Sequence, residues 1–178
     1  MIGKTVVLQL VNLFFPITPL TRWYQLRARL LRIAGVDCHR SARIVSSCRI
    51  VFLNISIGED TFIGEQVLIS GNETAKITIG NYVDIAPRVV IISGTHEIDM
   101  IGDHSAGAGK GAPVWIQDGV WIGANSTIVP GITIGRKSII GAGSVVVSDI
   151  PPFCVAVGNP CRPIKKWSPA TNTFERIE

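Results

Sequence analysis

The stretch IQDGVWIGANSTIVPGITIGRKSIIGAGSVVV, residues 116–147, carries an aliphatic residue at every sixth position. A period of six fits neither the 3.6-residue period of an amphipathic helix nor the two-residue period of a hairpin strand. A short fixed period is instead typical of a solenoid, in which each unit buries its apolar face only by stacking on the next. The repeating positions are Ile116, Ile122, Ile128, Ile134, Ile140 and Val146.

We interpret each unit as one short strand followed by a turn, with three units closing a triangular coil. The aliphatic residue points inward and stacks on its counterpart one coil away, at the strand spacing of about 4.8 Å. Stiff, branched side chains suit such strands. Small residues such as Gly123, Gly135 and Gly141 come next and keep the corners unobstructed. The pattern therefore predicts an all-β fold, a parallel β-helix of hexapeptide repeats.

The same period divides the rest of the chain. It returns irregularly from residue 44, so we expect an N-terminal segment at 1–43 and the β-helix at 44–160. Residues 93–113 interrupt it with a glycine-rich protruding loop, and a loop on a rigid scaffold is a common place for function. Two prolines, Pro151 and Pro152, stop the repeat, and 161–178 follows as a C-terminal tail, of which the polar residues 168–178 are expected to be loose.

The N-terminal segment is apolar and basic. Residues 1–19 are apolar but broken by prolines and too short to span a bilayer, and we expect them to be retained rather than cleaved as a signal peptide. Residues 20–34 fit a helix with Trp23, Leu26 and Leu30 on its inner face, capped by Thr18 or Thr21 and ended by Gly35. The arginine-rich face leaves two interpretations open. The helix closes the end of the solenoid, or residues 1–34 lie peripherally on an anionic membrane surface.

Composition narrows the class of protein. The chain has 178 residues and a net charge of +4, and 47% of its residues are apolar, which fits one domain with a large core. The arginine excess has no accompanying nucleic-acid motif, so we expect no nucleic-acid partner. Four scattered cysteines form no C-x-x-C pair, which favours reduced, buried thiols and a cytoplasmic location, with peripheral attachment to the inner membrane as the open alternative.

Four motifs resemble those of the hexapeptide-repeat acyltransferases. The nearest branch contains galactoside and maltose O-acetyltransferases and the acetyltransferases of bacterial surface-polysaccharide clusters. The resemblance implies a left-handed β-helix, assembly as a homotrimer, and acetyl-CoA as cosubstrate in a groove between neighbouring coils. The motifs are Trp121-Ile122-Gly123-Ala124-Asn125, Ile140-Gly141-Ala142-Gly143-Ser144-Val145-Val146, Asp149-Ile150-Pro151-Pro152 and Gly158-Asn159-Pro160-Cys161-Arg162.

Acetyl transfer to a hydroxyl requires a base near neutrality, and imidazole is suited to that role. His96 lies where the inserted loop leaves the coil and matches the family's catalytic histidine. Glu97 follows it, as in family members that pair an adjacent His and Glu, and is our candidate for orienting the ring. Asp84 and a main-chain carbonyl are the alternatives.

The resemblance also assigns a binding site for acetyl-CoA. Gly123, Ala124, Gly141 and Ala142 match family positions in the groove, although as corner residues they also have a structural role. Trp121 matches a family aromatic residue near the CoA and the acceptor, and Arg162 and Lys165 match cations near the CoA phosphates. The chain departs from the pattern at Ser148, where sugar O-acetyltransferases often carry a lysine.

These motifs predict an O-acetyltransferase that acts on a sugar hydroxyl of a bacterial surface polysaccharide or its precursor, with no metal. Two alternatives stay open, an N-acetyltransferase for an amino sugar or nucleotide-linked sugar, and a catalytically silent β-helix scaffold. A zinc enzyme on this fold would need three converging histidines. His39 and His96 lie about three coils, or roughly 14 Å, apart, so they do not share an ion.

Overall fold

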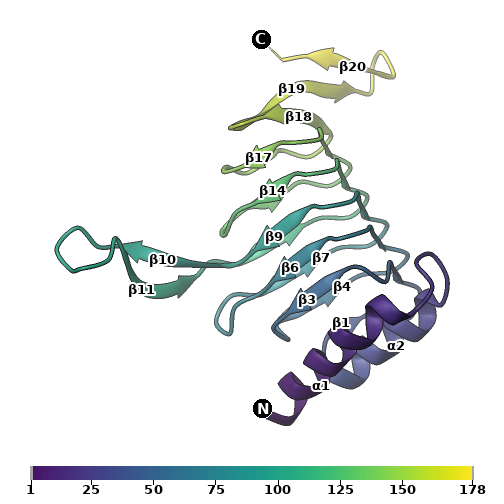
Figure 1. Cartoon of the computed structure of the whole chain (residues 1–178). Helices are drawn as coiled ribbons and strands as arrows, with labels where there is room; N and C mark the ends of the chain where they lie inside the picture. Colours follow the sequence, from purple (N-terminus) through teal and green to yellow (C-terminus); the bar gives the residue numbers. More distant parts are fainter. Residues whose placement is uncertain (1, 178) are drawn as a thin grey trace.

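The computed structural model describes residues 2–177, whose parallel strands stack into a three-sided β-helix (Figure 1). Partners in neighbouring coils are 18 residues apart in the regular part, as for Ile116 with Ile134 and Trp121 with Ile139. The six-residue period thus measures one side of a triangle, and the predicted β-helix is confirmed.

Each side of the triangle is a parallel sheet, and we number these faces in the order in which the chain visits them. The first face contains β1 (Asp37–Cys38), β4 (Ile55–Ile57), β7 (Ile77–Ile79), β12 (Val114–Ile116) and β15 (Thr133–Ile134). The second contains β2 (Arg43–Ile44), β5 (Phe62–Ile63), β8 (Asp84–Ile85), β13 (Trp121–Ile122), β16 (Ile139–Ile140), β18 (Cys154–Gly158), β19 (Cys161–Ser168) and β20 (Thr173–Arg176). The third contains β3 (Arg49–Val51), β6 (Leu68–Ser70), β9 (Val90–Ile92), β14 (Thr127–Ile128) and β17 (Val145–Val146).

The core is a column of aliphatic side chains along the axis of the coils. Ile122, Ile128, Ile134 and Ile140 are fully buried, while the residue before each of them is exposed or half-buried. Alternate residues of a strand point to opposite faces, so one side chain per strand enters the core. This pattern explains why the repeating position is always aliphatic.

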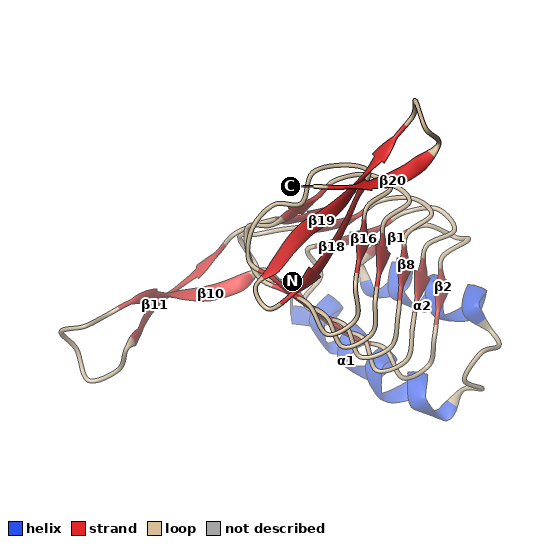
Figure 2. Ribbon diagram, turned by 90° about the horizontal axis from the view of Figure 1, so that it is seen from above, coloured by secondary structure: helices blue, strands red, loops and turns tan. Residues whose placement is uncertain are grey.

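The glycine-rich interruption is a two-stranded antiparallel hairpin. Its strands are β10 (Gly94–Ile98) and β11 (Ala106–Gly111), which project sideways from the stack of coils (Figures 1 and 2). The sequence predicts a protruding loop here but not its two strands. The coil resumes undisturbed, because Ile79 before the hairpin pairs directly with Ile116 after it.

Two helices close the N-terminal end of the solenoid. They are α1 (Ile2–Phe14), followed by the 3-10 turn η1 (Phe15–Ile17), and α2 (Tyr24–Ala34). The predicted helix at 20–34 therefore starts later, at Tyr24, and Gly35 ends it in a left-handed conformation as expected. Neither Thr18 nor Thr21 caps it, since the N-cap position is Trp23 with no side-chain hydrogen bond.

The buried face of α2 also differs from the expected one. Arg27, Ala28 and Leu31 are fully buried, while Trp23 and Leu26 are exposed. The side of α2 that meets the core is therefore centred on a buried arginine, Arg27, and not on Trp23 and Leu26.

The strands extend beyond the boundaries predicted at residues 44 and 160. Strand β1 already pairs with β4 in the first face. In the C-terminal tail, β19 and β20 add antiparallel strands to the second face, with Trp167 and Phe174 in an edge-to-face contact at 5.2 Å. The tail is ordered by this pairing rather than loose.

Candidate active site

The candidate residues lie on different edges of the triangular coil. The first edge joins the first and second faces, the second edge joins the second and third, and the third edge leads back to the first. The hairpin that carries His96 leaves the third edge, between β9 and β12. The corner positions Gly123, Ala124, Gly141 and Ala142 follow β13 and β16 and lie on the second edge.

His96 has an exposed side chain on β10, and its ring is held by the facing strand. Its Nδ1 lies 2.9 Å from the main-chain oxygen of Gly107. A carbonyl oxygen can only accept a hydrogen bond, so Nδ1 carries the proton and Nε2 is left as a proton acceptor. The hairpin thus fixes the tautomer that a general base requires.

Glu97 is not the ring's partner in this structure. Its Oε2 lies 2.8 Å from Nζ of Lys110 on β11, in a solvent-exposed ion pair. Neighbouring residues in a strand point to opposite sides, which separates this carboxylate from the imidazole. Asp84, the other carboxylate considered, lies 3.8 Å from Nη2 of Arg43. The partner of the His96 ring is therefore a main-chain carbonyl, as in the last of the alternatives considered from the sequence.

The second edge presents small side chains in register. Ala142 is exposed and Ala124 half-exposed one coil below it, and the main chain of Gly143 donates a hydrogen bond of 2.8 Å to the carbonyl of Ala124. A Cβ added at Gly143 would meet no described residue within 4 Å. The side chains of Ala124 and Ala142 on this edge are single methyl groups.

Gly123 and Gly141 face the next coil. A Cβ at Gly123 would lie 2.5 Å from the main-chain nitrogen of Ala142, and one at Gly141 would lie 2.6 Å from Cγ1 of Val157. Both glycines are therefore required for stacking, and the surface offered to a ligand belongs to Ala124 and Ala142. Trp121, on the outside of the second face, is 54% exposed.

Arg162 and Lys165 are exposed on β19 at the C-terminal end of the solenoid. Nη1 of Arg162 contacts the main-chain oxygen of Cys161 at 2.8 Å and Oγ of Ser148 at 3.5 Å. Ser148 stands where sugar O-acetyltransferases often carry a lysine, so Arg162 brings a positive charge to that position. The donor set fits the phosphate groups of a nucleotide such as CoA.

The base of the hairpin rests on Asn72, whose packing at this place is not predicted from the sequence. A Cβ at Gly111 would lie 2.8 Å from Oδ1 of Asn72, and one at Gly94 would lie 3.3 Å from its Nδ2. Asn72 therefore fills the space between the two strands where they leave the body. The extra residues at 71–76 were the available signal, because they enlarge the same edge one coil earlier.

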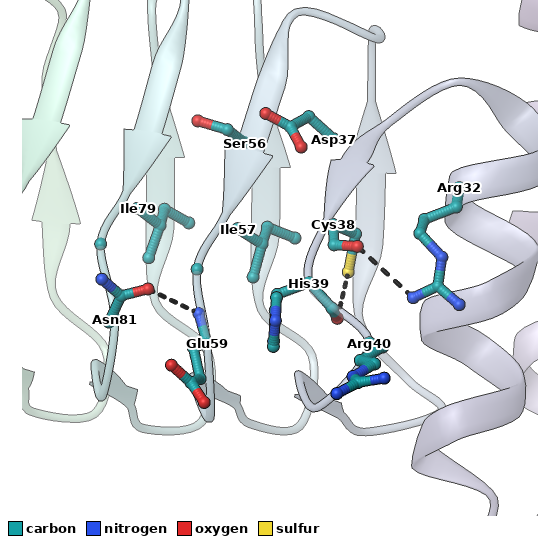
Figure 3. A pocket seen from close by; sticks show the side chains of 12 residues that line it. Arg32, Asp37, Cys38, His39, Arg40, Ser56, Ile57, Glu59, Ile79 and Asn81 are labelled. Carbon is teal, nitrogen blue, oxygen red and sulfur yellow. Dashed lines mark hydrogen bonds between the residues drawn. The ribbon is translucent and has the colours of Figure 1, made fainter.

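A separate hollow lies at the first edge, near the N-terminal end (Figure 3). It is lined by residues including Arg32, His39 and Glu59, and Nδ1 of His39 lies 2.7 Å from Oγ of Ser41. This turn contact agrees with the structural role expected for His39. The hollow does not include His96, which leaves the coil at another edge.

One protomer therefore does not gather the whole candidate site. The base is on the third edge, while Trp121, the small residues and the cations lie on the second face, the second edge and β19. The tip of the hairpin is also strongly apolar, with Ile98, Met100 and Ile101 between 81% and 99% exposed.

Comparison with known proteins places this architecture in a family. Residues 113–148 match the family model described as bacterial transferase hexapeptide (six repeats). The galactoside O-acetyltransferase of Escherichia coli K12 is 41% identical over 117 residues, which cover 64% of this chain and 54% of that enzyme. The chain spans about half the length of the curated relatives it matches.

Solved structures match over nearly the whole chain. A maltose O-acetyltransferase from Clostridium difficile is 38% identical with a TM-score of 0.78, covering 93% of this chain and 87% of that one. A hexapeptide-repeat acetyltransferase from Vibrio cholerae, solved with acetyl coenzyme A, is 30% identical with a TM-score of 0.79, covering 93% and 88%. The chain therefore belongs to the hexapeptide-repeat acetyltransferase family.

Proposed function

We propose that this protein is an acetyl-CoA-dependent O-acetyltransferase that acetylates a sugar hydroxyl. The observation that carries the proposal is the hydrogen bond of 2.9 Å between His96 Nδ1 and the Gly107 carbonyl, which leaves Nε2 free as a base. Family membership supports the donor, since the V. cholerae relative was solved with acetyl coenzyme A. The relatives named for galactosides and maltose support a sugar acceptor.

In the proposed mechanism the acceptor hydroxyl attacks the thioester directly. The thioester supplies an activated acetyl carbon, and a C–O bond forms as the C–S bond breaks. His96 Nε2 takes the hydroxyl proton and returns it to the departing thiolate. The Gly107 carbonyl holds the ring and stabilises the imidazolium that forms. Glu97 has no direct part in this scheme.

We further propose that the working form is a homotrimer, whose sites lie between protomers. The base lies on the third edge of a single protomer, and the proposed CoA groove runs along its second edge. A second copy is therefore needed to bring the base and the groove together. The apolar hairpin tip supports this assembly, because Met100 and Ile101 are 81% and 99% exposed in the single chain and a partner would cover them.

We assign the acceptor to a bacterial surface polysaccharide or its precursor. The support is the arginine-rich N-terminal helix, which resembles that of the polysaccharide-cluster acetyltransferases rather than that of the free-sugar enzymes.

The test is release of free CoA from acetyl-CoA with a panel of galactosides, maltose, amino sugars, nucleotide sugars and lipid-linked glycans. We expect turnover with a sugar hydroxyl, and a loss of about 10²–10⁴-fold in kcat for His96→Ala with CoA affinity unchanged by calorimetry. His39→Ala, at the first edge, is the matched control and should keep full activity. Undiminished turnover by His96→Ala would refute the role of the base, and inactivity toward the whole panel would refute the acceptor class.

A further inference from the structure

The outward side of α1 is apolar, although its inward side already packs on the core. Val6, Leu10, Leu13 and Ile17 follow one another at helical spacing and are between 47% and 80% exposed. Leu8, Val11 and Phe15 are buried on the opposite side. A helix that is apolar all round normally has its second face covered as well, because exposed apolar patches mark binding surfaces.

The turn between the helices continues this apolar surface, and a buried arginine holds it. The guanidinium of Arg27 donates hydrogen bonds to the hydroxyl of Thr18 and to the main-chain oxygens of Pro19, Leu20, Arg22 and Ile44. The turn therefore has a fixed shape. It presents Leu20 and Trp23, which are 45% and 56% exposed.

Trp23 adopts a left-handed backbone conformation, with φ of 60°. A bulky residue rarely adopts this conformation, and such strain persists only when the surroundings enforce it. The indole of Trp23 is largely in solvent. Tryptophan is the residue most suited to the boundary between water and hydrocarbon, since its ring is apolar and its N–H is polar.

The charge around this surface has one sign. The first acidic residue of the chain is Asp37, so residues 1–36 contain only basic charges. Three arginines, Arg29, Arg32 and Arg40, line one hollow beside α2, together with the polar side chains of Gln25 and Ser41. Guanidinium groups gathered in this way suit phosphate oxygens.

We propose that this end of the molecule binds peripherally to a bilayer containing anionic lipids. We define the basal surface as the exposed apolar residues of α1, η1 and the turn that leads to α2, which are Val6, Leu10, Leu13, Phe14, Ile17, Leu20 and Trp23. The apolar members enter the boundary of the acyl chains, and Arg29, Arg32 and Arg40 hold lipid phosphates. Among residues 2–177 no helix is long and apolar enough to cross a membrane.

Charge complementarity favours lipid over a second copy of the chain. A twofold contact through the basal surface would bring two sets of arginines together, with no carboxylate from residues 1–36 to balance them. An anionic bilayer supplies that balance. The proposal is independent of the acetyl-transfer chemistry, because none of the basal residues belongs to the candidate active site.

The experiment is flotation of the full chain with vesicles of phosphatidylcholine alone or with 30% phosphatidylglycerol. We expect binding to the anionic vesicles that weakens as salt is raised. Leu13→Ser/Ile17→Ser and Arg29→Glu/Arg32→Glu should each lower the partition coefficient on the order of tenfold or more. Trp23 fluorescence should shift to the blue on binding, and Trp23→Phe should lack that shift.

Matched control variants at the other end of the molecule distinguish binding through the basal surface from nonspecific adsorption to vesicles. Ile164→Ser and Arg136→Glu/Lys137→Glu, which alter exposed residues away from the helices, should float like the wild type. The proposal is overturned if the chain does not bind phosphatidylglycerol vesicles, or if basal and control variants bind alike. It is also overturned if the basal variants bind vesicles normally but change the oligomeric state in sedimentation velocity, since the surface would then be an interface between copies.

Discussion

The ring of His96 is joined to the main-chain oxygen of Gly107 by a hydrogen bond of 2.9 Å that crosses from one strand of the hairpin to the other. The partner is a backbone atom, so its position depends on the pairing of β10 with β11 and not on any side chain. The pairing of β10 with β11 shifts its register between His96 and Ile98, next to this hydrogen bond. The orientation of the base is thus a property of the hairpin.

Glu97 and Lys110 should matter little for catalysis. Their side chains are 61% and 47% exposed, and an ion pair of this kind contributes about 0–1 kcal/mol. We expect Glu97→Gln and Lys110→Met to change kcat/KM by less than about threefold. Steady-state kinetics beside His96→Ala checks this. A loss for Glu97→Gln as large as that for His96→Ala would show that the carboxylate orients the ring in the working enzyme.

Two defective variants should complement each other if the sites are shared. His96→Ala removes the base on the hairpin, and Arg162→Glu reverses a charge on β19. In mixed trimers formed by coexpression, one pairing in four brings an intact base to an intact β19, so we expect about a quarter of wild-type activity at low acetyl-CoA. Activity no higher than the average of the two separate variants would indicate that each protomer works alone.

Gly135 should be intolerant of any side chain. A Cβ there would lie 2.3 Å from the main-chain nitrogen of Pro152 in the next coil. We expect Gly135→Ala to lower the free energy of unfolding by about 1–3 kcal/mol in urea titrations. Gly109→Ala is the control, because its Cβ would meet no described atom within 4 Å, and its unfolding free energy should stay within about 0.5 kcal/mol of the wild type. Equal effects of the two variants would contradict this account of coil stacking.

The two thiols beneath the helices predict a loss of stability in alkali. Burial raises the pKa of Cys38 and of Cys48 from 9.0 to about 12. Between these values the unfolded chain loses protons that the folded chain keeps, so the stability present below pH 9 falls as the pH rises toward 12. We expect a loss of roughly 1 kcal/mol per thiol at pH 10 under reducing conditions.

The measurement is the difference in unfolding free energy between pH 8 and pH 10. Cys48→Ala should show a smaller difference than the wild type, because one of the two groups is gone. Neither thiol should react with iodoacetamide in the folded protein at pH 8, since both are buried and protonated. An unchanged pH dependence in Cys48→Ala would exclude the thiol as its cause.

The coils of this fold are well predicted from the sequence, because the six-residue period equals one side of the triangular coil. One aliphatic residue per strand enters the core, so Ile116 to Val146 can be assigned to their faces from spacing alone. The pattern is weaker at the N-terminus. Apolar residues lie on the buried side of α1, as Leu8 and Val11 do, and on its exposed side, as Leu10 and Leu13 do, so the sequence does not show which side meets the core.

Contacts to main-chain atoms, at the N-terminal end and in the candidate site, are harder to predict. Arg27 is buried by hydrogen bonds to main-chain oxygens that meet only after the turn has formed, and no spacing of residue types indicates them. The same is true of the Gly107 carbonyl. His96 could be selected from its place in the inserted loop, but its partner is an atom that every residue possesses.

The direct pairing of Ile79 with Ile116 has a consequence for how such enzymes diversify. The intervening arm is attached at a single corner, so its length and composition can change while the scaffold keeps its register. Lengthening, shortening or exchanging that arm would move His96, the base of the proposed mechanism, relative to unaltered coils. If that mechanism holds, acceptor choice is separated from folding, and a chimaera that carries another family member's arm is a route to new glycan specificity.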